Sequence, residues 1–227
     1  MSWRDLTITP VVECCVFASA FAIAWSLRGL YDLSFFAACL VFYAAVVVLT
    51  LITLKVIRSL FPIRPGIYTF RRHPWPCYVW NLHEFLCGTN LNRYYFHGLV
   101  PFALKKFFYR LLGAKMGKGV VAIGGLLLDP SLIAIEENVI VGAGSTLSAH
   151  LVTVVASEDT LILGRILIRE GALIGGNVQI MPGVTVGEHA MINNMAFVPL
   201  NTMIPPYEVW GGNPAKKLLE IPRKAEP

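Results

Sequence analysis

The chain has 227 residues, enough for one domain with an appendage but not for two full enzyme domains. With 56% hydrophobic residues, 15% charged residues and a mean hydropathy of +0.61, it is neither a disordered linker nor an ordinary soluble globule. The formal net charge of +5 is concentrated, because residues 55–118 carry eleven of the 19 basic residues and a single acid, Glu84.

Two apolar segments open the chain. Residues 11–27 are apolar apart from Glu13 and a few serines, and residues 33–54 form 22 positions without any charge. A bilayer core needs about 20 apolar residues in a helix, so we predict a transmembrane hairpin over residues 1–57. A signal peptide fits poorly, because Glu13 interrupts the first segment and a second span follows at once. The other alternative is a pair of buried helices in a soluble core.

The charges after the second segment predict its orientation. Lys55, Arg58, Arg64, Arg71 and Arg72 follow it, whereas the turn between the segments is balanced in charge. By the positive-inside rule both termini and everything after residue 57 are cytoplasmic, which for a bacterial protein means an inner-membrane location.

The cysteines provide no metal site by spacing. All five precede residue 88 and lie in the apolar or basic part of the chain, which suits a reducing compartment and buried thiols. We therefore predict no metal.

Residues 58–115 combine the basic block with aromatic side chains. Fourteen of the 26 aromatic residues lie between residues 61 and 118, and residues 102–112 alternate apolar and cationic faces at helical spacing. Directly after two spans, this composition predicts a collar in the lipid headgroup layer. A nucleic-acid surface is the alternative, but no recognition motif supports it.

The C-terminal part, residues 116–227, has a period of six. One column of β-branched aliphatic residues has eight members: Ile162, Ile168, Ile174, Ile180, Val186, Ile192, Val198 and Ile204. A second column, four residues further on, holds small or aliphatic side chains. Neither a helix nor a plain strand has this period, so we predict a β-solenoid in which each six residues form a short strand and a turn.

The period continues upstream with a break. Ile135, Val141, Leu147 and Thr153 keep the spacing of six, whereas nine residues separate Thr153 from Ile162. We predict an irregular loop over residues 152–160.

These motifs resemble the hexapeptide-repeat acyltransferases, the left-handed parallel β-helix family. The run Gly-Asn-Pro-Ala at 212–215, after a proline-bearing exit, is similar to the end of that family's domain, and residues 183–190 resemble one of its rungs. A closer likeness, from residue 111 through Ser148-Ala-His150 to Ala215, is to the membrane-embedded terminal domains of polylysine-synthase-like enzymes and their stand-alone relatives. The resemblance implies a homotrimer that binds acyl-CoA, most simply acetyl-CoA, between adjacent β-helices.

The same resemblance implies a histidine as general base, and its position matches His150. An imidazole with a pKa near neutrality can accept a proton from a hydroxyl or amine as that group attacks a thioester. The carboxylates nearest in sequence that could orient it are Glu158 and Asp159. The alternative reading is that His150 is a solvated turn residue.

For the co-substrate, the resemblance points to the last rungs and the terminal segment. The residues chosen are Asn177, Trp210, Gly212 and Lys216, with Lys216 near the CoA phosphates. Trp210 and the following turn could equally be a cap over the end of the solenoid.

The function expected is transfer of an acyl group from acyl-CoA to a hydroxyl or amine of a membrane-proximal acceptor, such as a lipid-linked glycan. Two alternatives stay open: a non-catalytic, membrane-anchored trimeric scaffold, and amide-bond formation on a carrier-bound amino acid or peptide. A γ-class carbonic anhydrase shares the solenoid but needs several converging histidines, and only His150 and His189 lie in the repeat region.

Overall fold

The computed structural model describes residues 3–88, 90–91, 102–122 and 125–222. The chain divides into two compact units, which are described separately. The first comprises Met1–Pro62 with Pro74–Leu99, and the second comprises Ile63–His73 with Val100–Pro227. The predicted collar is thus shared between the units, and its residues 92–101 lie outside the described residues.

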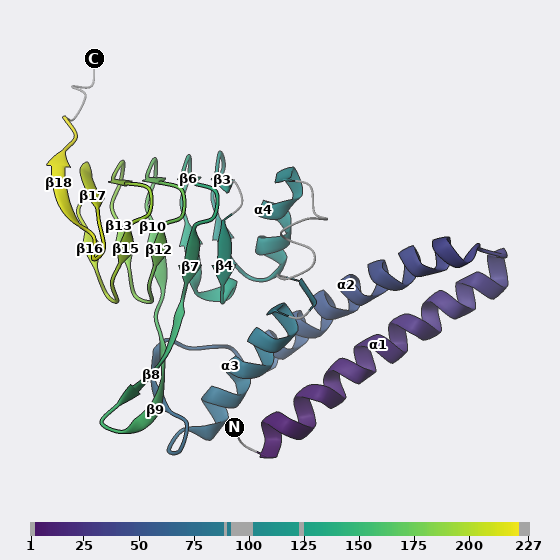
Figure 1. Cartoon of the computed structure of the whole chain (residues 1–227). Helices are drawn as coiled ribbons and strands as arrows, with labels where there is room; N and C mark the ends of the chain where they lie inside the picture. Colours follow the sequence, from purple (N-terminus) through teal and green to yellow (C-terminus); the bar gives the residue numbers. More distant parts are fainter. Residues whose placement is uncertain (1–2, 89, 92–101, 123–124, 223–227) are drawn as a thin grey trace. The chain divides into compact units, whose positions relative to one another are not determined.

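The first unit is helical, with α1 (Trp3–Tyr31), α2 (Phe35–Leu60) and α3 (Pro74–Cys87) (Figure 1). α1 and α2 form the predicted hairpin and pack through a small core of Val16, Ala20 and Val46. Small residues such as Ala20 and Ala24 on α1 allow the close helix approach that is typical of membrane helix pairs.

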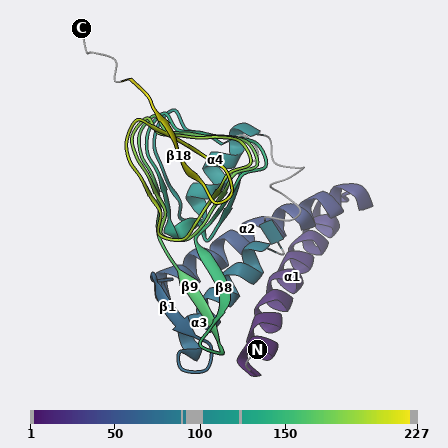
Figure 2. The same cartoon turned by 60° about the vertical axis from the view of Figure 1, so that its left-hand side comes forward.

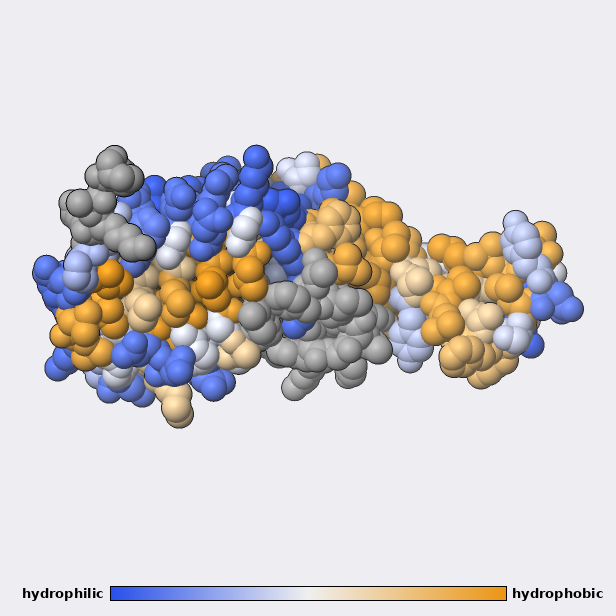
Figure 3. All heavy atoms as spheres, turned by 90° about the horizontal axis from the view of Figure 1, so that it is seen from above, coloured by the Kyte–Doolittle hydropathy of each residue, from blue (hydrophilic) through white to orange (hydrophobic). Residues whose placement is uncertain are grey.

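Most of the remaining surface of α1 and α2 is apolar. Ile8–Tyr31 and Phe35–Leu60 are long and apolar enough to cross a membrane by length and composition. Phe21, Trp25 and Phe35 are each at least 60% exposed, and the corresponding surface, at the right of Figure 3, is largely hydrophobic. A surface of this kind is costly in water and is typical of a lipid- or protein-facing one.

The second unit is a parallel β-helix with three sheets, which appear as nested triangular outlines in Figure 2. The first sheet contains β2 (Lys115–Met116), β5 (Ile133–Ile135), β10 (Ile166–Ile168), β13 (Thr185–Val186) and β16 (Met203–Ile204). The second contains β3 (Val121–Ala122), β6 (Ile140–Val141), β11 (Leu173–Ile174), β14 (Met191–Ile192), β17 (Glu208–Gly211) and β18 (Lys216–Glu220). The third contains β4 (Leu126–Leu128), β7 (Thr146–Ser148), β12 (Gln179–Ile180) and β15 (Phe197–Val198).

The period of six builds this solenoid. Leu173 lies opposite Met191, and Gln179 opposite Phe197, so one coil takes 18 residues, or three hexapeptides. The predicted column from Ile168 to Ile204 points inward, since all seven of its members are at most 2% exposed. The predicted hexapeptide solenoid is therefore confirmed over these residues.

Ile162 and Thr153 are exceptions, because they lie outside the coils. They belong to β8 (His150–Val155) and β9 (Glu158–Leu163), an antiparallel hairpin whose two-residue turn, Ala156 and Ser157, has φ values of 48° and 64°. The prediction of an irregular loop over 152–160 was wrong. Two left-handed turn residues match the twist of paired strands, and alternating valines and threonines favour strand structure.

The hairpin gains a third strand from a distant part of the chain. β1 (Gly66–Thr69) pairs antiparallel with β9, with Gly66 opposite Leu163 and Thr69 opposite Thr160. The hairpin lengthens its coil to 33 residues, as the pairing of Ile140 with Leu173 shows.

Both ends of the solenoid are covered. At the start, α4 (Phe102–Leu111) carries the fully buried Tyr109, whose hydroxyl donates to the Gly125 carbonyl and accepts from the Leu127 amide, each at 3.2 Å. A short 3₁₀ helix, η2 (Pro130–Leu132), follows β4. At the far end, β18 turns back and pairs antiparallel with β17.

Candidate active site

His150 and Asp129 meet at one corner of the solenoid. Asp129 directly follows β4, and His150 begins β8 just after β7. Because β4 and β7 pair in parallel, with Leu128 opposite Ser148, the residues that leave these strands lie one above the other. Two adjacent coils therefore bring together residues that are 21 positions apart in the sequence.

The contact between the two side chains is short. His150 Nδ1 lies 2.6 Å from Asp129 Oδ2, and the side chains are 18% and 0% exposed, respectively. A carboxylate at this distance accepts a hydrogen bond from Nδ1–H, which assigns the tautomer and directs proton exchange to Nε2. This is the relation between an orienting carboxylate and a general base.

The backbone supports this arrangement on both sides. Asp129 has φ 54° and ψ 61°, a left-handed conformation that aspartate and asparagine adopt more readily than most other residues except glycine. Pro130 continues directly into η2. On the other strand, Ser148 Oγ donates to the His150 carbonyl at 2.7 Å and so fixes the start of β8.

The carboxylates predicted to orient His150 lie elsewhere. His150 is opposite Leu163, at the base of the hairpin, whereas Glu158 is opposite Val155 at its tip. Five residues of strand separate these positions, about 17 Å. The hairpin thus carries Glu158 and Asp159 away from His150, and this prediction was wrong.

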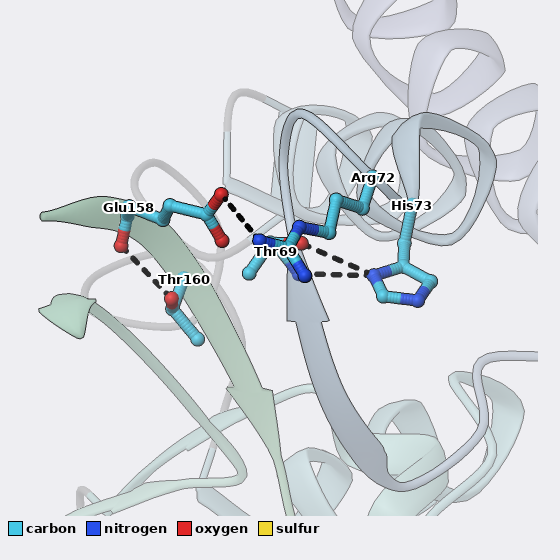
Figure 4. A network of polar contacts seen from close by, with 5 residues as sticks. All are labelled: Thr69, Arg72, His73, Glu158 and Thr160. Atoms are coloured by element: carbon cyan, nitrogen blue, oxygen red, sulfur yellow. Dashed lines mark hydrogen bonds and ion pairs between the residues drawn. The ribbon is translucent and has the colours of Figure 1, made fainter. Parts of the chain in front are cut away.

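Glu158 instead takes part in a network at the tip (Figure 4). Arg72 Nη2 contacts Glu158 Oε1 at 3.1 Å, and Thr160 Oγ1 donates to the Glu158 carbonyl at 2.9 Å. Nearby, His73 Nδ1 lies 3.3 Å from both the amide and the hydroxyl of Thr69. These contacts tie the segment after β1 to the tip of the hairpin.

The residues predicted to bind the co-substrate occupy a different corner. Asn177 lies between β11 and β12 with φ 55°, and Gly212, two coils later, follows β17 with φ 95°. Trp210 is in β17, and Lys216 begins β18 as an exposed residue opposite Gly211. Within one chain the third sheet separates this corner from His150.

A cluster of charged residues connects β17 with β18. Lys217 Nζ lies 2.8 Å from Glu208 Oε1, and Trp210 Nε1 donates to Glu208 Oε2 at 2.7 Å. Hydrogen bonds from Lys217 and then Trp210 lower the pKa of Glu208 below its ordinary value. Hydrogen bonds to Glu208 and Glu220 raise the pKa of Lys217.

Asp129 was missed by sequence reasoning, although a signal existed. In a solenoid, residues at one corner recur once per coil, so the partner of His150 had to be sought about one coil upstream. The first coils are irregular, with Leu127 opposite Leu147 at an offset of 20 rather than 18, which conceals the correspondence.

Comparison with known proteins agrees with the repeat. Residues 165–199 match the family described as "Bacterial transferase hexapeptide (six repeats)". This part of the chain is therefore a bacterial transferase hexapeptide repeat, and the resemblance found in the sequence is confirmed.

One curated relative is a delta-poly-L-ornithine synthetase of Acinetobacter baumannii (strain AB307-0294), 25% identical over 123 residues. The match covers 54% of this chain but only 9% of that protein.

Two acetyltransferases are among the solved structures to which the chain is similar. A hexapeptide-repeat acetyltransferase of Vibrio cholerae O1 biovar eltor, solved with acetyl coenzyme A, has a TM-score of 0.47 and 22% identity, covering 56% of this chain and 81% of that one. A maltose O-acetyltransferase of Clostridium difficile 630 has a TM-score of 0.49 and 18% identity, covering 71% and 95%.

Proposed function

We propose that this chain is a membrane-anchored acyltransferase that uses acyl-CoA, with a left-handed β-helix and His150 as general base. The observation that carries the proposal is the His150–Asp129 pair, held at a corner of the β-helix whose later coils, residues 165–199, match the transferase hexapeptide family. A buried carboxylate on a ring nitrogen serves proton transfer, and a solvated turn histidine would have no need of it.

The reaction follows from this geometry. His150 Nε2 accepts the proton of the acceptor's O–H or N–H while the acceptor oxygen or nitrogen attacks the thioester carbonyl carbon. Collapse of the tetrahedral intermediate forms the ester or amide and breaks the C–S bond. The proton on His150 then passes to the leaving CoA sulfur, which regenerates the base. Such proton transfer contributes typically about 10²- to 10⁴-fold to the rate.

The co-substrate would bind to a neighbouring copy of the chain, at the corner that carries the residues predicted to bind it. Asn177 is one flat of the solenoid away from His150 in the same chain, about five residues or 16 Å, and Trp210, Gly212 and Lys216 lie about two coils further along the axis. Packing the flats of three chains together would bring one copy's His150 corner to its neighbour's CoA corner, so we propose a homotrimer.

An apolar ladder on the outside of the solenoid supports this assembly. Val121, Ile140, Leu173 and Met191 are outward-facing partners on consecutive strands of the second sheet, and none of them is buried. Such a ladder is the kind of surface that a stable homo-oligomer covers.

The acceptor would be membrane-proximal, for example a lipid-linked glycan or a lipid-borne amine. Five residues, 61–65, connect Leu60 at the end of α2 to Gly66 at the start of β1 and can span at most about 22 Å. Gly66 of β1 and His150 of β8 both lie opposite Leu163 of β9. The chain itself therefore tethers the strand that begins with His150 to the end of a candidate membrane span, with the termini and the β-helix cytoplasmic in our proposal.

The match to a poly-L-ornithine synthetase supports a second candidate, amide-bond formation on a carrier-bound amino acid or peptide. The same base would then deprotonate an amine, and the thioester would belong to a carrier protein. The donor distinguishes the two candidates.

The test is acyl-CoA binding by calorimetry and release of free thiol, with the detergent-purified protein. The wild type should bind acyl-CoA and release thiol, and His150→Ala should bind with similar affinity but lose turnover. His189→Ala is the matched control, because His189 packs against Tyr207 at a corner of the solenoid, with ring centroids 5.2 Å apart, and its loss should leave activity intact. Absence of binding by the intact protein would favour a carrier-protein donor or the scaffold.

A further inference from the structure

The helical unit contains a polar cluster inside the candidate spans that the proposed reaction does not use. Asn90, which follows α3, donates from its amide nitrogen to Glu13 Oε2 on α1 and to Thr50 Oγ1 on α2, each at 3.1 Å. Glu13 is the only acidic residue between Ile8 and Tyr31. Ionisable residues within membrane spans are rare and usually mark a path or a site for a polar ligand.

The cluster is built into the packing of the unit. Thr50 is 0% and Asn90 3% exposed, and Thr50 continues the buried face of α2 marked by Val46 and Leu54. Glu13 is only half-buried, and its neighbour Cys14 is exposed. Asn90 and Thr50 are thus buried, whereas Glu13 is partly exposed at the surface of α1.

The cluster has unused hydrogen-bonding capacity. Thr9, one turn before Glu13 on the same side of α1, is 2% exposed, and its Oγ1 has no hydrogen-bond partner among the described residues. Over the same described ranges, Asn90 is the only side chain that bonds to Glu13, and no cation lies within salt-bridge distance of it.

We infer that Glu13, Thr9 and Thr50 form a binding site for a primary ammonium group. A carboxylate in apolar surroundings with one neutral donor is costly unless a positive charge compensates it. An ammonium group supplies that charge and three N–H donors, and the Glu13 carboxylate and the two threonine hydroxyls are acceptors for them. A choline headgroup has no N–H and does not fit.

The depth of Glu13 suits a ligand that comes from the headgroup layer. It lies two residues into the apolar run that begins at Val11, about 3 Å along the helix. The ammonium group can belong to an aminophospholipid or to an amine acceptor. The inference rests on the membrane insertion that forms part of the proposed function, but not on the acyl transfer.

The experiment compares nanodiscs of phosphatidylethanolamine and phosphatidylglycerol with nanodiscs in which phosphatidylcholine of the same acyl chains replaces the ethanolamine lipid. For the full chain, the ethanolamine lipid should raise the thermal midpoint by about 3 °C or more. Glu13→Gln, which keeps the shape, should abolish this shift, and Thr9→Val should reduce it. Asp32→Asn, an acid outside the cluster, should leave it intact.

Adding free ethanolamine to the phosphatidylcholine discs separates the two sources. A shift produced only by the lipid assigns the site to a headgroup, whereas a shift with the soluble amine, accompanied by faster thiol release, assigns it to the acceptor. Three results would overturn the inference. The first is an equal thermal midpoint in both lipids with no effect of the soluble amine. The others are a full shift in Glu13→Gln and the same shift on adding sodium. Thiol release in the discs tests acyl transfer independently, while a chain soluble without lipid or detergent would refute the anchorage and the ammonium site together.

Discussion

At the scale of single residues, Asp129 has two roles that follow from one conformation. Its left-handed backbone turns the chain into η2, and the same geometry directs a fully buried carboxylate at His150 Nδ1. Only a residue with a short acceptor side chain can do both, because glycine lacks the carboxylate and glutamate is one methylene longer. Asparagine keeps the shape but not the charge.

Asp129→Asn should therefore lower kcat for thiol release by about 10²-fold or more, with little change in the KM for acyl-CoA. The neutral amide cannot stabilise the imidazolium, and it can present its NH₂ to Nδ1, which favours the wrong tautomer. Steady-state kinetics across pH check this, since a purely structural role would leave the pH profile in place. Glu188→Gln, on an exposed turn, is the matched control.

Three asparagines at the corners of the solenoid have a structural role. Asn177, predicted to bind the co-substrate, has a left-handed backbone and stacks its side chain against Gly144 of the coil below, whose φ is 73°. Asn138 and Asn201 repeat the arrangement against Gly119 and Gly183. A structural role at the corner is thus visible, and the proposed contact with CoA is additional to it.

Gly144→Ala should destabilise the solenoid by about 1–3 kcal/mol, because a Cβ there would collide with Asn177 Oδ1 and φ is unfavourable for alanine. Thermal unfolding in detergent measures the loss. Gly29→Ala is the control, since nothing lies within 4 Å of its Cβ position in a helix. Equal effects of the two changes would contradict the corner stacking.

At the scale of elements, the hairpin turn is a position where the sequence is not optimal for its conformation. Ala156 and Ser157 both have positive φ, a geometry that Asn-Gly adopts with less strain. The double change Ala156→Asn with Ser157→Gly should raise stability by about 1 kcal/mol without altering activity. A lower melting temperature would mean that β8 and β9 are not joined by this turn.

The pairing of β17 with β18 depends on pH through Glu208 and Lys217. The lowered pKa of Glu208 means that its contribution is complete above the unfolded value of about 4.3 and is lost as pH falls through the folded pKa. The raised pKa of Lys217 means that its contribution is complete below about 10.4 and is lost as pH rises through the folded pKa.

We therefore expect Lys217→Met to lower the melting temperature by a constant amount between about pH 5 and pH 10. The difference from wild type should shrink under more acidic conditions, where Glu208 becomes neutral in both proteins. Melting curves across this range test the pair, and a difference that persists unchanged in strong acid would assign the effect to packing instead.

At the scale of the whole molecule, the repeat and the position of its interruption were predictable, whereas the hairpin that forms the interruption was not. Aliphatic side chains at every sixth position identify the residues that point inward. The column from Ile168 to Ile204 was therefore sufficient to predict the solenoid. Ile162 keeps the spacing of six residues by coincidence, since it is six residues before Ile168 but lies in the sheet of the hairpin. Partners such as β1 and Asp129 depend on pairing between distant segments, which no local pattern encodes.

The proposed trimer has a whole-molecule consequence that mixing can test. If one copy supplies His150 and its neighbour supplies the Trp210–Lys216 corner, two inactive variants should complement each other. Co-expression of His150→Ala with a variant disrupted at Lys216 and Gly212 should restore about a quarter of the wild-type sites by random assembly. No recovery in co-purified mixed oligomers would place both corners of a site in one chain.

The pairing of β1 with β9 also has a consequence for synthesis. Thr69 and Thr160 are partners, so a nascent chain must lengthen by 91 residues after Thr69 before β1 meets its neighbouring strand. At about 5–20 residues per second, that interval lasts roughly 5–18 seconds. During this time the apolar hairpin of α1 and α2 has already left the ribosome, followed by a short strand with open edges. In the membrane-anchored form that we propose, insertion of α1 and α2 would therefore begin before the coils can fold, and the chain would be expected to be targeted to the membrane during its synthesis.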